Sequence, residues 1–60
     1  MNDMKRKFKI EYRWKGDSKY ATKTYLVDAN NEFEALDYFK NKYIGAYRYK
    51  DIEEVKCRPL

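Results

Sequence analysis

The chain has 60 residues, of which 40% are charged and 18% are aromatic, and its formal net charge at neutral pH is +4. It has one cysteine and no histidine, which excludes an intrachain disulfide and the usual zinc and copper ligand sets. A chain this short is expected to form one domain, residues 1–60, with a core too thin for a deep catalytic cleft.

The charge is distributed unevenly along the chain. Residues 1–23 carry eight Lys or Arg against three Asp or Glu, whereas residues 24–46 carry two against four. The first residues lack the apolar segment of a signal peptide, and no apolar run approaches the length of a membrane span. We therefore expect a cytoplasmic protein without membrane association.

The N-terminal half predicts a β-hairpin. Between residues 7 and 14 apolar and charged side chains alternate strictly, a pattern typical of a half-buried strand, here about residues 5–15. Gly16-Asp17 suits a two-residue type II′ turn, and β-branched and aromatic residues follow in the return strand, which reaches Asp28.

The two-residue turn also predicts the register of the hairpin. Phe8 should lie opposite Tyr25, and Ile10 opposite Lys23. In this register the apolar side chains of the first strand, together with Tyr25 and Val27, face the helix that follows.

An amphipathic helix is predicted from Glu32 to Ile44. Asn30 or Asn31 can cap it, and Glu34 three residues after Asn31 resembles a capping box. Gly45 is expected to end the helix in a left-handed conformation.

Residues 46–51 are predicted to form a polar, aromatic connection to a third strand, which runs from about Ile52 to Arg58. Val55 and Cys57 should face the core. The predicted fold is therefore α+β: a three-stranded antiparallel sheet of order 2-1-3 with one helix packed on one face, β-β-α-β.

One segment of the chain has a pattern known from other small proteins. It reads Val27-x-Ala29-x-x-x-x-Glu34-Ala35 and joins a strand to a short amphipathic helix. In this layout the chain resembles small β-β-α-β proteins of phages and mobile elements, among them anti-CRISPR proteins. The resemblance implies an inhibitor that acts by protein–protein contact, and it assigns no role to any single residue.

The open face of the sheet is the first candidate binding surface. Lysine and arginine on a strand can neutralise phosphates, and tyrosines among them can stack on unpaired bases. The same residues also suit a solvated face that keeps strand edges from pairing, or a surface for an acidic protein. The candidate residues, which include the aromatic and cationic stretch after the helix, are Lys5, Lys7, Lys9, Arg13, Tyr20, Tyr47, Arg48, Tyr49 and Lys50.

The seven tyrosines are predicted to divide between core and surface. Tyr12, Tyr25 and Tyr43 are assigned to the rim of the core. The residues assigned to partner contact are Tyr20, Tyr38, Tyr47 and Tyr49. The acidic helix face around Glu34 and Asp37 either stabilises the helix dipole or imitates phosphate.

Enzyme chemistry is not expected. The adjacent Glu53 and Glu54 should point to opposite faces of a strand, and Cys57 should behave as a small core residue. No cofactor is implied. The leading hypothesis is a non-enzymatic binding protein for nucleic acid or a nucleoprotein; the alternatives are a phage-type inhibitor and a structural subunit that forms a homodimer through its open sheet face or edge.

Overall fold

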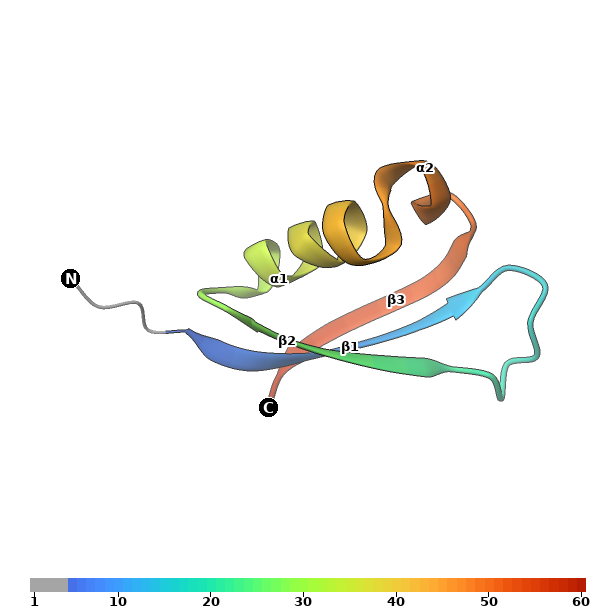
Figure 1. Ribbon diagram of the computed structural model, residues 1–60. Coiled ribbons are helices and arrows are strands. Elements are labelled where there is room, and N and C mark those ends of the chain that lie inside the picture. Colours follow the sequence, from blue (N-terminus) through green and yellow to red (C-terminus); the bar gives the residue numbers. More distant parts are fainter. Residues whose placement is uncertain (1–4) are drawn as a thin grey trace.

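The computed structural model describes residues 5–60 and shows an antiparallel sheet covered on one face by a layer of helical segments (Figure 1). The strand order is β2-β1-β3, which confirms the predicted α+β fold and its sheet topology. In chain order the elements are β1 (Arg6–Trp14), β2 (Lys23–Ala29), α1 (Glu32–Tyr38), the π-helix η1 (Phe39–Ile44), α2 (Ala46–Tyr49) and β3 (Ile52–Pro59).

The hairpin forms, but its predicted turn and register are wrong. Residues 15–22 connect β1 to β2, in place of a two-residue turn. Phe8 lies opposite Val27, and Ile10 opposite Tyr25, a shift of two residues from the prediction. The shift keeps every side chain on its predicted face and places an aromatic residue, instead of Lys23, beside the fully buried Ile10.

The predicted N-terminal cap of the helix is confirmed. The side chain of Asn31 accepts a hydrogen bond from the backbone N–H of Glu34 at 2.7 Å. The Glu34 carboxylate in turn accepts from the backbone N–H of Asn30, also at 2.7 Å, one residue before the position reached in the usual capping box.

The second half of the predicted helix is a π-helix. In an α-helix, residues five apart lie about 140° apart around the axis, so Phe39 and Ile44 would not share a face. The wider π-helical turn brings residues five apart to the same side. Phe39 and Ile44 are both buried, so burial of both side chains accounts for the change of helix type.

Gly45 ends the π-helix at the predicted position, with φ 96° and ψ 131°. Its φ is positive, as predicted, although this ψ differs from that of the left-handed helical conformation. The short helix α2 follows where an irregular connection was predicted. The backbone N–H of Lys15 donates to the carbonyl of Asp51 at 2.8 Å, and this contact holds the end of α2 beside the end of β1.

β3 pairs with β1 and contains one irregularity. Its register shifts between Arg13 and Trp14, so that Glu54 lies opposite Arg13 while Ile52 lies opposite Trp14. Val55 and Cys57 are half-buried and pack against the core, as predicted.

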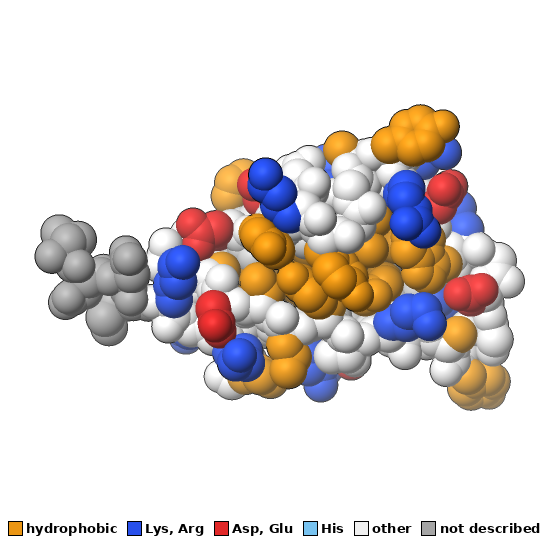
Figure 2. Space-filling view, viewed as in Figure 1, with side chains coloured by type: hydrophobic (Ala, Val, Ile, Leu, Met, Phe, Trp, Pro, Cys, Tyr) orange, Lys and Arg blue, Asp and Glu red, His pale blue; other side chains and the backbone are white. Residues whose placement is uncertain are grey.

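The core is formed by one face of the sheet and the helical layer. Its fully or largely buried members are Phe8, Ile10, Tyr12, Ala29, Ala35, Phe39 and Ile44. Trp14 belongs to the apolar side chains of β1 that were predicted to face the helix, but it is only half-buried because it is the last residue of the strand. Figure 2 shows an apolar band along the junction between the helical layer and the sheet.

Candidate functional site

The nine predicted binding residues do not form one surface. Lys7, Lys9 and Arg13 lie on the open face of the sheet, and the exposed Lys5 precedes β1 at the end of the strand farthest from α2. The residues of segment 47–50 belong to α2 and its C-terminal end, within the helical layer on the other face of the sheet (Figure 1).

The cations of the open face lie close to carboxylates. Lys7 Nζ lies 3.3 Å from the carboxylate of Asp28, across the β1–β2 pair. Glu11, at the centre of β1, is 3.9 Å from Lys9 Nζ and 3.2 Å from the guanidinium of Arg58. This face is therefore a network of opposite charges, whereas the sequence predicted a predominantly basic face.

Arg13 is largely buried, which contradicts its prediction as an open contact residue. Its side chain is 12% exposed, and its guanidinium lies 3.6 Å from the carboxylates of both Glu53 and Glu54. The two glutamates therefore meet one cation, contrary to the predicted separation, because the irregular pairing at this end of β3 alters the alternation of side chains.

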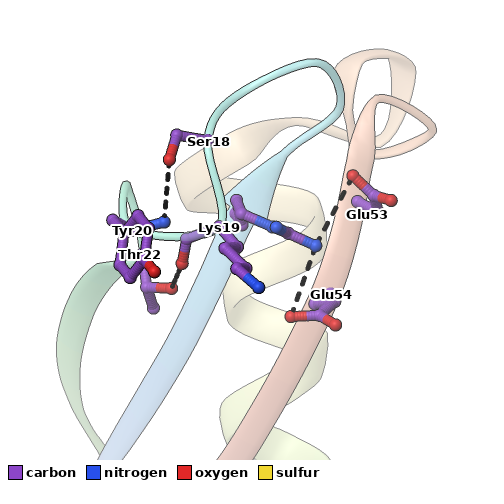
Figure 3. A network of polar contacts seen from close by, with 7 residues as sticks. Ser18, Lys19, Tyr20, Thr22, Glu53 and Glu54 are labelled. Carbon is purple, nitrogen blue, oxygen red and sulfur yellow. Dashed lines mark hydrogen bonds and ion pairs between the residues drawn. The ribbon is translucent and has the colours of Figure 1, made fainter.

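The loop of residues 15–22 lies beside this ion pair, as Figure 3 shows. Within it, Tyr20 N–H donates to Ser18 Oγ at 3.1 Å, and Thr22 Oγ1 donates to the carbonyl of Lys19 at 3.4 Å. Tyr20 is 88% exposed, and Lys19 Nζ lies 5.9 Å from the centre of its ring.

A second set of cations lies beside aromatic rings around α2. The guanidinium of Arg48 lies 5.1 Å from the ring centre of Trp14, and Lys50 Nζ lies 5.2 Å from that of Tyr47. Lys40 Nζ lies 5.2 Å from the ring centre of Tyr49. We call this set the α2 surface; its members are Trp14, Lys40, Tyr47, Arg48, Tyr49 and Lys50.

The rings of the α2 surface differ in exposure. Tyr47 is 83% exposed, as expected of a contact residue. Tyr49 instead packs edge-on against Phe39, with ring centres 6.4 Å apart, so it joins the surface to the core. Sequence reasoning missed Lys40 and assigned Trp14 to the core alone, because the fold alone brings both residues beside α2.

The tyrosines predicted for the core rim form a stacked cluster. Tyr25 and Tyr43 stack with ring centres 3.9 Å apart, although Tyr43 remains about half-exposed. Burial raises the pKa of Tyr12 to about 12, and the nearby hydroxyl of Tyr43 adds to this effect. Burial likewise raises the pKa of Tyr25, with a smaller contribution from the negative charge of ionised Tyr38 and Tyr43.

The acidic side chains of α1 contribute to the helix itself. Glu34 completes the cap, and the carbonyl and carboxylate of Asp37 both accept from the Asn41 side chain, at 3.1 and 2.9 Å. Burial, followed by the negative charge of Glu32, raises the pKa of the Cys57 thiol, which disfavours the nucleophilic thiolate.

Within residues 5–60, no three side chains of the metal-binding types lie close enough together to hold an ion. In the same range, no helix has the length and apolar character needed to cross a membrane. Comparison of the chain with protein-family models, with curated proteins and with solved structures found no match. The resemblance to phage proteins therefore stays a prediction.

Proposed function

We propose that the protein is a non-enzymatic module that binds single-stranded nucleic acid through the α2 surface. The observation that carries the proposal is the repeated pairing of a cation with an aromatic ring in one region: Arg48 with Trp14, Lys50 with Tyr47, and Lys40 with Tyr49. An exposed ring offers a base a stacking partner, and a neighbouring cation offers the phosphate a counter-charge.

The distances between cations and carboxylates favour the α2 surface over the open sheet face as the binding site for a polyanion. Lys7, Lys9 and Arg13 all lie within 4 Å of carboxylates, so a polyanion that docked on the sheet would compete with those carboxylates. Among the described residues, Arg48 and Lys40 have no carboxylate within 4 Å, and Lys50 is 3.7 Å from the exposed Asp51.

The charge of the longest regular helical segment favours single strands over duplex DNA. α1 carries Glu32, Glu34 and Asp37 within seven residues, so its exposed side would repel the phosphates that flank a groove. α2 has only four residues, which makes it too short to act as a reading helix. Stacking of an unpaired base on the exposed ring of Tyr47 needs neither.

The proposal is tested with two variants of equal charge. Arg48→Gln/Lys50→Gln and Lys7→Gln/Lys9→Gln each remove two positive charges, which changes the net charge from +4 to +2. Fluorescence anisotropy with a labelled single-stranded oligonucleotide measures the affinity of each variant over a series of salt concentrations. Circular dichroism checks that both variants fold.

We expect the α2-surface variant to lose about tenfold in affinity near physiological salt, because two phosphate contacts are lost. The slope of log affinity against log salt should become shallower by about 1.4, at roughly 0.7 per contact for single strands. The sheet-face variant should change far less. Equal losses in both variants, or no binding by the parent protein at low salt, would contradict the proposal.

A further inference from the structure

β3 is an edge strand with an apolar groove beside it. Its only strand neighbour within residues 5–60 is β1. The groove, about 440 Å³ in volume, lies between the helical layer and β3 and is lined by Phe33, Leu36, Asp37, Lys40, Tyr49 and Val55. Phe33 is 81% exposed, although it is a large apolar side chain.

The open-face side of β3 carries one acid, Glu54, followed by two bases, Lys56 and Arg58. Pairing with Lys9, Glu11 and Arg13 places Arg58, Lys56 and Glu54, respectively, on the open face of the sheet. Val55 lies between Glu54 and Lys56 in the chain and points to the other face, toward the groove. An acid and a base thus stand symmetrically on either side of one apolar residue.

We propose that a second copy of the chain pairs antiparallel with β3, centred on Val55. In that register Val55 of one copy faces Val55 of the other, and Glu54 faces Lys56 twice, by symmetry. Side chains directly opposite each other on one face of an antiparallel pair lie close enough to form ion pairs. The exposed backbone groups of the edge would be satisfied at the same time.

The neighbouring registers oppose like charges. A shift of the centre by one residue places Glu54 opposite itself, or Lys56 opposite itself, and like charges in that position are destabilising. A centre on Cys57 places Lys56 opposite Arg58. The Lys56-centred register also places Glu54 opposite Arg58, but it keeps one like-charged pair at its centre. Of the centres from residue 53 to residue 57, Val55 is the one that places no like charges opposite each other, and it keeps both helical layers on the same side of a six-stranded sheet.

The other edge, β2, lacks this complementarity. A symmetric pair centred on Leu26 would place Thr24 opposite Asp28, so no acid would face a base. The β3 edge therefore fits a second copy better. Lys40 and Tyr49 of the α2 surface line the groove beside β3, whereas the residues changed in the test, Glu54 and Lys56, lie outside that surface. The measurement of mass therefore does not depend on nucleic-acid binding.

The test uses charge reversal and mixing. Sedimentation equilibrium of the full chain should give a mass that rises with concentration from 7.4 kDa toward twice that value. Glu54→Lys and Lys56→Glu alone should each remain at the monomer mass, because each places like charges opposite one another. An equimolar mixture of the two variants should regain the dimer mass, since every facing pair is then opposite in sign.

The mixing experiment separates lost pairing from lost folding, because a misfolded variant is not rescued by its partner. Glu54→Lys also removes the ion pair between Glu54 and Arg13, whereas Lys56→Glu leaves the Arg13 ion pairs in place. Lys56→Glu therefore controls for the loss of that ion pair. Leu26→Lys on the opposite edge should leave the dimer intact. A parent protein that stays monomeric at millimolar concentration, single variants that still dimerise, or dissociation by Leu26→Lys would overturn the proposal.

Discussion

At the scale of single residues, the stability of this small domain depends on Phe39. It is fully buried, and its ring lies within 6.4 Å, centre to centre, of the rings of Tyr12, Tyr25, Tyr43 and Tyr49. Aromatic pairs in such contact stabilise a fold beyond the apolar area that they bury. Among the described residues, no other aromatic ring contacts as many neighbouring rings.

Replacement of Phe39 with alanine should lower the free energy of unfolding by about 3–5 kcal/mol, because a cavity would remain at the centre of the aromatic cluster. A loss of this size unfolds a marginally stable domain. Phe33→Ala is the matched control: it lies in the preceding helical segment, is 81% exposed, and should change stability by less than about 0.5 kcal/mol. Urea denaturation measures both, and equal effects of the two changes would contradict the described core.

The raised pKa of Tyr12 predicts that the folded protein loses stability at high pH. Its pKa is about 12 in the folded protein against 10.0 for an unperturbed tyrosine, so the folded state retains the proton that the unfolded state releases. The contribution of the protonated Tyr12 hydroxyl to the free energy of unfolding is therefore fully present below pH 10 and is lost as the pH rises toward 12. Its size is on the order of 2 kcal/mol.

Unfolding free energies measured between pH 9 and 12 check this expectation, and Tyr12→Phe serves as the control, since phenylalanine has no proton to lose. The variant should show a smaller decline over the same interval. Identical declines in the two proteins would show that the Tyr12 hydroxyl titrates normally in the folded state.

At the scale of elements, the change from α1 to η1 decides how the helical layer fits the sheet. The π-helical turn places Ile44 on the same side as Phe39, and Gly45 then turns the chain into α2. The backbone of Gly45, at φ 96° and ψ 131°, lies in a region that residues with a side chain rarely adopt. A Cβ added there would meet no atom within 4 Å, so the constraint is on the backbone and not on space.

Gly45→Ala should therefore lower the free energy of unfolding by roughly 1–3 kcal/mol. Gly45→Ser should lower the free energy of unfolding by about the same amount as Gly45→Ala, because the space around Gly45 is open for the larger side chain as well. Thermal unfolding of both variants tests the expectation. A parent-like melting temperature for Gly45→Ala would show that the chain can turn at this point without a positive φ.

At the scale of the whole molecule, the cations of the open sheet face and those around α2 lie in different surroundings. The Cα radius of gyration is 12.1 Å, above the roughly 10.4 Å of a compact domain of this length, because the molecule is elongated, with extents of 44 × 23 × 12 Å. On the open face, cations lie within ion-pair distance of acids, while around α2 they lie beside aromatic rings. The net charge of +4 therefore does not describe where a polyanion would bind, and the two charge-matched variants are designed to separate net charge from placement.

The local patterns of the sequence determined most of the fold. Strict alternation in β1, the Asn31 cap with Glu34, and the glycine at position 45 each depend on neighbours a few residues away. Such features follow from backbone and side-chain preferences that act over one turn or one pleat. The strand order could also be predicted from the sequence. β2 occupies one side of β1, and the helix returns the chain so that β3 pairs with the other side.

Tertiary packing alone decided the register, the π-helix and the candidate site. The hairpin register depends on Tyr25 packing beside Ile10, an interaction that outweighs the turn preference of Gly16-Asp17. The partners of Arg13 and Arg48 are separated from them by more than thirty residues in the chain. Whether a lysine or arginine meets a carboxylate or a ring depends on which strands and helices the fold brings together, and no local pattern contains that information.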